Sequence, residues 1–264
     1  MSCRLFRLAV VVNIFLGYVY ALHVSQDGKE LFELSLIHIN DFHARFEQTG
    51  VGSGTCHPGE EDTCVGGIAR IVTAVKDLVK TRPNAVFLNA GDNFQGTMWY
   101  TKFKWNVTAQ FLNMLPHDAL ELSSTGKLKF SDEIETVTAE AANLKAQGVD
   151  IIIGLSHSGL DVDREVAASV PDLDVIVGGH SHTFLYTGTP PSTEFPEDSY
   201  PVIVEQTGGR KVLIVQAYAY SKYVGNITVW FDGKGEFAAW EGRPILLDKN
   251  VQQGLYGNTY TVSF

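Results

Sequence analysis

Short apolar runs alternate with amphipathic stretches along most of the chain, a pattern typical of an α/β protein. Strand-like and helical segments follow one another over residues 34–39, 66–82, 85–90, 109–115, 133–147, 149–155, 162–169 and 174–177. In the helical segments the apolar residues recur three and four positions apart, whereas the strand-like runs are short and rich in valine and isoleucine. We therefore predict an open α/β sheet covered by helices.

The last third of the chain has a different pattern. A loop rich in proline, threonine and serine is predicted at residues 187–196. Alternating strands are then predicted at 202–205, 211–217, 225–231 and 237–240. Asp232-Gly233 marks a turn between the last two of them.

Aspartate and histidine side chains follow four of the strand-like runs, at the point where each run ends. These residues are Asp41 and His43, Asp92, His157, and His180 and His182. One such histidine in a glycine- and serine-rich loop is more often a hydrogen-bonded loop residue than a ligand. Four strand ends with the same chemistry favour a shared site, because open α/β sheets bind ligands at the carboxyl ends of their strands. Mixed aspartate and histidine sets suit divalent metals, and pairs of such ions hydrolyse phosphate esters.

Composition narrows the range of partners. The 264 residues are 45% hydrophobic and 19% charged, which suits one large globular domain. The formal net charge of −10 argues against a nucleic-acid partner, whose phosphates would be repelled. An anionic substrate would need local cations, and metal ions would supply them.

The first residues resemble a signal peptide. Arg4 and Arg7 precede an apolar run over residues 8–20, and Val19-Tyr20-Ala21 has the small residues of a cleavage site. We predict that residues 1–21 are removed and that the protein is secreted. The alternative is a membrane anchor, but the run is short for a span, and no second apolar run or hydrophobic C-terminal tail follows.

The cysteines agree with an extracellular protein. Cys3 lies in the predicted signal peptide, which leaves Cys56 and Cys64 as a candidate disulfide around a polar loop. Zinc binding by this pair is the weaker alternative, because His57 is the only nearby imidazole. Asn106 and Asn226 begin candidate N-glycosylation triplets.

The motifs together resemble a known family. Residues 39–43, 91–97, 156–159 and 178–188 look like the metallophosphatase domain of the 5'-nucleotidase/apyrase family. The similarity extends from Leu34 to Asp248, and animal ecto-5'-nucleotidases and arthropod salivary apyrases look most similar. It implies a four-layer α/β/β/α sandwich and matches Cys56–Cys64 to a family disulfide.

The resemblance also implies roles for the strand-end residues. Asp41, His43 and His182 would hold one metal, Asp92 would bridge, His157 and His180 would hold the second, and Asn93 would support the bridging residue. The implied cofactors are two divalent ions (Zn, Mn, Mg or Ca), and the implied partners are extracellular nucleotides. The family reaction is in-line attack of a metal-activated water on a terminal phosphate of AMP, ADP or ATP.

One family motif is missing. The family carries Gly-Asn-His-Glu between the second and third motifs found here; its Asn is a metal ligand and its His stabilises the transition state. This chain passes from Asp118-Ala119-Leu120 directly to sequence found further on in the family, so we predict a deletion seam near 120/121. The predicted organisation is a signal peptide (1–21), an incomplete metallophosphatase domain (22–248) and a divergent tail (249–264), without the family's nucleotide-gripping C-terminal domain.

These departures lead to three hypotheses. The first is a secreted nucleotide hydrolase with reduced or no activity, because the missing side chains act on the second metal and the transition state. The second is a non-catalytic secreted scaffold or binder. The third is a non-functional splice or truncation product.

Overall fold

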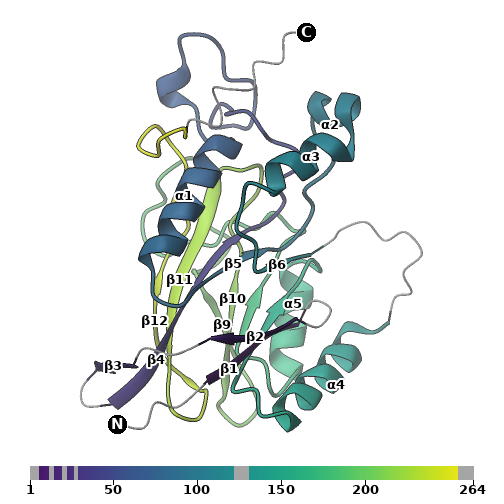
Figure 1. Cartoon of the computed structure of the whole chain (residues 1–264), viewed down its shortest axis with the longest axis vertical. Coiled ribbons are helices and arrows are strands. Elements are labelled where there is room, and N and C mark those ends of the chain that lie inside the picture. Colours follow the sequence, from purple (N-terminus) through teal and green to yellow (C-terminus); the bar gives the residue numbers. More distant parts are fainter. Residues whose placement is uncertain (1–5, 12–14, 20–22, 27–28, 122–130, 255–264) are drawn as a thin grey trace.

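The computed structural model describes residues 6–11, 15–19, 23–26, 29–121 and 131–254, and before Glu30 it describes the backbone alone. Two sheets face each other, with helices on their outer faces (Figure 1). The first sheet has the order β2 (Phe15–Val19), β1 (Phe6–Val11), β7 (Ile151–Leu155), β8 (Val175–Val177), β10 (Lys211–Val215) and β9 (Val202–Glu205).

The second sheet packs against the first through a shared core. Its order is β12 (Phe237–Gly242), β11 (Tyr223–Phe231), β4 (Lys29–Ile39), β5 (Ala85–Asn89) and β6 (Ala119–Leu120), with β3 (His23–Gln26) paired to β4 and β13 (Ile245–Leu246) paired to β11. The helices are α1 (Ile68–Thr81), α2 (Met98–Phe103), α3 (Trp105–Leu112), α4 (Glu133–Ala146) and α5 (Leu160–Ser169).

The alternation along β4 explains the layers. Leu34 and Leu36 face the core between the two sheets, where they pack with residues of β7 and β8. Ile37 and Ile39 point the other way and pack under α1, as expected for a strand whose successive side chains lie on opposite faces. On the far side, α5 packs against β9 and β10, and α4 against α5. The predicted four-layer α/β/β/α fold is confirmed.

Parallel pairing brings the predicted site together. Ile39 of β4 is in register with Asn89 of β5, and Leu155 of β7 with Val177 of β8. The loops that carry the aspartates and histidines therefore leave the two sheets at neighbouring strand ends.

Most predicted elements form close to their predicted bounds. The predicted short helix at 109–115 lies earlier, at Trp105–Leu112, and α2 precedes it without having been predicted. The strand β6 was also not predicted; it is two residues long, and such a length leaves no periodic signal. The Asp232-Gly233 turn is present between β11 and β12, with the Asp232 amide donating to the Glu236 carbonyl.

The predicted signal peptide overlaps two strands. β1 pairs in parallel with β7, placing Leu8 beside Ile151, and β2 pairs antiparallel with β1. Cleavage after Ala21 stays a prediction, and it would remove both strands. Among the described residues, no helix is both long and apolar enough to cross a membrane.

The predicted disulfide and the two candidate glycosylation sites lie in different surroundings. Cys56 and Cys64 form the predicted disulfide, with their Cα atoms 5.9 Å apart. Asn106 is exposed on α3, whereas Asn226 is only 7% exposed within β11 and is unfavourably placed for a glycan.

The carboxyl of Asp174, at the amino end of β8, couples stability to pH. It is buried, accepts hydrogen bonds from the Ile152 amide and from Arg210, and burial raises its pKa to about 6 from 3.8. Because the carboxyl has a higher pKa in the folded than in the unfolded protein, it stabilises the folded state fully below about pH 4. This stabilisation is lost as the pH rises to about 6. Relative to Asp174→Asn, wild type should lose about 3 kcal/mol of unfolding free energy between pH 3 and 8. Urea unfolding at several pH values measures this, and parallel pH profiles for the two proteins would refute it.

Candidate metal centre

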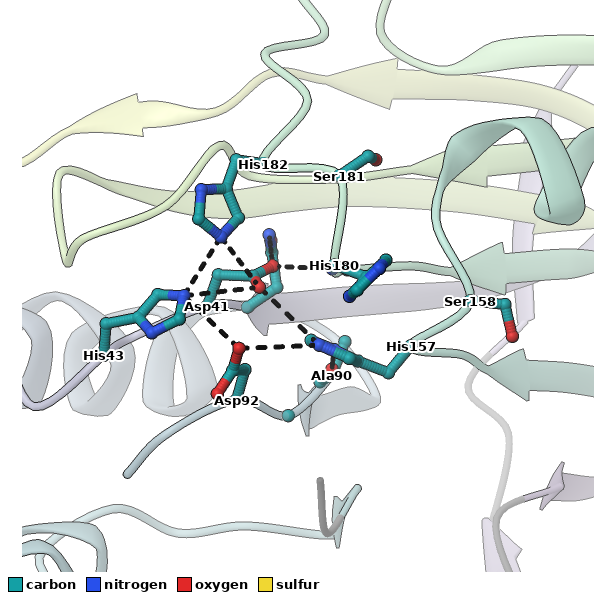
Figure 2. Close-up of polar contacts among 12 residues, drawn as sticks. Asp41, His43, Ala90, Asp92, His157, Ser158, His180, Ser181 and His182 are labelled. Atoms are coloured by element: carbon teal, nitrogen blue, oxygen red, sulfur yellow. Dashed lines mark hydrogen bonds and ion pairs between the residues drawn. The ribbon is translucent and has the colours of Figure 1, made fainter. Parts of the chain in front are cut away.

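Loops after β4, β5, β7 and β8 converge on one cluster of carboxylates and imidazoles (Figure 2). Asp41 lies at its centre, fully buried, with its Oδ2 accepting from the Asn40 side chain and from the His180 amide. Its other oxygen, Oδ1, faces the histidines. The structure therefore brings residues from all four predicted strand ends together.

The first group joins Asp41, His43 and His182. The Nε2 atom of His182 lies 3.2 Å from Asp41 Oδ1, and that of His43 lies 3.8 Å from it. The two Nε2 atoms are 3.0 Å apart. All three ligand atoms lie within 4.8 Å of one another, which is a spacing that one metal ion can bridge.

The second group joins Asp41, Asp92 and His157. His157 Nε2 lies 3.7 Å from Asp41 Oδ1 and 4.0 Å from Asp92 Oδ2. Asp92 Oδ2 also lies 3.4 Å from His43 Nε2, so the two groups adjoin. Asp41 belongs to both groups, and the bridging role predicted for Asp92 stays a prediction.

Backbone carbonyls set the tautomers of two histidines. His43 Nδ1 lies 2.9 Å from the Gln95 carbonyl, and His157 Nδ1 lies 2.5 Å from the Ala90 carbonyl. A carbonyl only accepts hydrogen bonds, so Nδ1 carries the proton and Nε2 presents a lone pair to the cluster. Metal-binding histidines show this arrangement, and these residues fit divalent ions.

The backbone at the cluster is strained. Asp41, His43, Asp92, His180 and His182 all have φ between 50° and 75°, which is uncommon for residues other than glycine. Each such residue costs on the order of 1–3 kcal/mol and persists where surrounding structure requires it, often at functional sites. The strained backbone of these residues is therefore a further sign that the cluster is a functional site.

Electrostatics keep the central carboxylate ionised. Burial acts to raise the pKa of Asp41, but hydrogen bonds from His182 and Asn40 and the nearby His157 hold it below its ordinary value. The same hydrogen bond to Asp41 raises the pKa of His182. Protons and metal ions therefore compete for this pair.

Two of the predicted residues lie outside both groups. The His180 side chain is exposed, and His180 meets Asp41 through its backbone amide, while its ring lies 5.3 Å from that of His157. Asn93 is buried and accepts from Asn89 through its Oδ1, a position that supports the loop after β5. Its predicted role in supporting the bridging residue stays a prediction.

Three nearby residues were not predicted to belong to the site. Tyr220 lies 5.0 Å from the His182 ring and 5.5 Å from the His43 ring, and the Arg45 guanidinium lies 5.1 Å above the Tyr220 ring. Glu121, at the end of β6, is the third. Arg45 follows the Asp41 turn, and Tyr220 lies in a segment that also resembles the family. Their positions beside these motifs could have indicated that both residues lie near the site.

Comparisons with known proteins agree with this geometry. Residues 34–118 match the calcineurin-like phosphoesterase family. An apyrase from Tabanus yao is 41% identical over 298 residues, covering 87% of this chain and 53% of the apyrase. A 5'-nucleotidase from Bos taurus is 35% identical over 292 residues, covering 84% of this chain and 50% of its own length.

The chain spans about half the length of these relatives. Their alignments, at 298 and 292 positions, are longer than the 264 residues of this chain, so the relatives carry residues within the aligned region that this chain lacks. A solved structure, the 5'-nucleotidase precursor of Thermus thermophilus, superimposes with a TM-score of 0.76 at 28% identity, covering 86% of this chain and 57% of that one. By sequence and by fold, this chain is a relative of the 5'-nucleotidases and apyrases, built on the calcineurin-like phosphoesterase domain.

Proposed function

We propose that this protein is a secreted, metal-dependent phosphohydrolase of extracellular nucleotides that works slowly. The observation that carries the proposal is the pair of ligand groups that share Asp41. The names of its relatives, apyrase and 5'-nucleotidase, favour AMP, ADP or ATP as substrate.

The residues of the cluster divide the work. When bound, two adjacent divalent ions make water a nucleophile near neutral pH and neutralise phosphoryl oxygens. Asp41 and Asp92 would hold the ions. Nδ1 of His43 and of His157 keeps its proton and donates it to a backbone carbonyl, which leaves Nε2 available. His182 would complete the first group.

Charge at the rim suits an anionic substrate. The protein carries a formal net charge of −10, so phosphate needs local positive charge to approach. Arg45 offers it beside the first group, stacked over Tyr220. Tyr220 and Arg45 would thus orient a phosphate toward the cluster.

The low rate follows from the missing Gly-Asn-His-Glu motif. Removing one preorganised donor of transition-state charge lowers kcat by about 10²–10³. Secretion is supported by the N-terminal pattern of residues 1–21 and by the Cys56–Cys64 disulfide, which suits an oxidising compartment.

Phosphate release from AMP, ADP and ATP tests the proposal. The purified protein with Mn²⁺, Zn²⁺ or Ca²⁺ should release phosphate faster than Asp92→Ala, because that substitution removes a carboxylate from the second group. Equal rates for the two proteins would overturn catalysis. Nucleotide binding without turnover would instead support the alternative of a non-catalytic binder, which the missing motif favours.

A further inference from the structure

Glu121 stands at the carboxyl end of β6, next to the candidate metal centre. Its backbone amide donates to the Asn89 carbonyl at 2.9 Å and so continues the parallel pairing of β5 and β6. The residue follows the predicted seam directly and is the last described residue before the gap at 122–130. The hydrogen bond to Asn89 therefore fixes the backbone position of Glu121.

The carboxylate of Glu121 is directed inward. Its Oε2 atom is buried, and within the described part of the chain it has no hydrogen-bond partner. Burying an ionised carboxylate oxygen without a partner is unfavourable, so such atoms are expected to bind a proton or a cation.

Gly91 locates this oxygen relative to the cluster. A side chain at Gly91 would collide with Glu121 Oε2 and would come within 3.2 Å of His157 Nδ1, so both groups lie over the same glycine. Glu121 also lies within electrostatic range of His157 and of Asp92. Gly91 has φ of 92°, so glycine both permits the turn and leaves the space that the carboxylate fills.

We propose that Glu121 is an additional ligand of the metal ion held by Asp92 and His157. This inference rests on the proposed metal centre and extends it to a residue outside both ligand groups. Glutamate suits the role because carboxylate oxygens bind divalent ions such as Mn²⁺ and Mg²⁺. Its side chain is long enough to approach the centre from a neighbouring strand.

The proposal has a consequence for charge. Asp41, Asp92 and Glu121 would bring three negative charges to a centre of two divalent ions. A more anionic ligand set binds a divalent ion more tightly and leaves it a weaker electrophile. We therefore expect the site of Asp92 and His157 to bind its metal ion tightly and to contribute little to catalysis.

Binding of Mn²⁺ to the full chain tests the role of Glu121. Free Mn²⁺ is measured by electron paramagnetic resonance during titration of metal-stripped wild type, Glu121→Gln, Glu205→Gln and Asp92→Ala. Glu205→Gln is the matched control, because Glu205 is an exposed glutamate at the end of β9. Far-UV circular dichroism of each stripped protein checks folding, and Glu121→Asp replaces Glu121→Gln if the latter is unfolded.

We expect wild type and Glu205→Gln to bind two ions per chain, and Glu121→Gln to bind the second at least about 10-fold more weakly. Glu121→Asp, with a shorter side chain, should fall between them. Identical titrations of folded Glu121→Gln (or Glu121→Asp) and wild type would overturn the role of Glu121 alone. No binding by wild type would overturn the metal centre itself, so the two failures are distinguishable.

Discussion

Replacing Asp41 by asparagine should abolish the stabilisation of the protein by Mn²⁺ and its phosphatase activity. Asp41 is the one residue common to both ligand groups, and its Oδ1 faces three histidines. Removing its charge weakens both sites at once, so we expect a loss of at least about 100-fold in metal affinity, since even supporting residues of metal sites contribute 10–100-fold. A thermal melt with and without Mn²⁺ measures the effect, because a ligand that binds the folded state raises the melting temperature.

The control for this substitution is Asp161→Asn. The Asp161 side chain is 93% exposed, and among the described residues its ion pair is with Arg164, so its loss should leave the Mn²⁺ shift unchanged. Asn40 and the His180 amide can still hydrogen-bond an asparagine at position 41, which favours folding of the variant. A Mn²⁺ shift of wild-type size in Asp41→Asn would contradict the shared role of Asp41.

Removing residues 1–21 should open the edge of the first sheet. β1 supplies the parallel partner of β7 at four positions, from Leu8 beside Ile151 to Val11 beside Gly154. Each lost backbone hydrogen bond is worth about 1 kcal/mol, so we expect the melting temperature to fall by roughly 10 °C and aggregation to increase. Hydrogen exchange should show faster exchange of β7 amides in the shortened chain.

The amides of β8 are an internal control for this experiment. β8 pairs with β7 on one side and β10 on the other in either form of the protein. Its protection should therefore change much less than that of β7. Equal protection of the β7 amides in the long and short chains would contradict the pairing of β7 with β1. Removal of residues 1–21 on secretion would then leave the first sheet intact.

The strand-end residues could be singled out from the sequence because they follow a rule of parallel sheets. Asp41, Asp92 and His157 each come directly after an apolar strand, and strands of this kind end at the same edge. Local sequence does not determine which way a side chain turns after the strand. His180 therefore satisfied the pattern but lies with its ring exposed, outside both groups.

Other features were beyond the reach of the pattern. The hydrogen bonds that fix His43 and His157 involve carbonyls of Gln95 and Ala90, on a different strand end, and arise only in the folded chain. Glu121 gave no signal, because a single glutamate after a two-residue strand resembles any polar surface position. An apolar run near two arginines is typical of a signal peptide and also of a strand. The sequence of residues 6–19 therefore did not distinguish between these two interpretations.

Two metal ions would be held around Asp41, one with His43 and His182 and the other with Asp92 and His157. Crystals of the protein grown with Mn²⁺ would test this arrangement through an anomalous difference map. The account predicts one peak among Asp41, His43 and His182 and a second among Asp41, Asp92 and His157. A map without a peak at either group would contradict it.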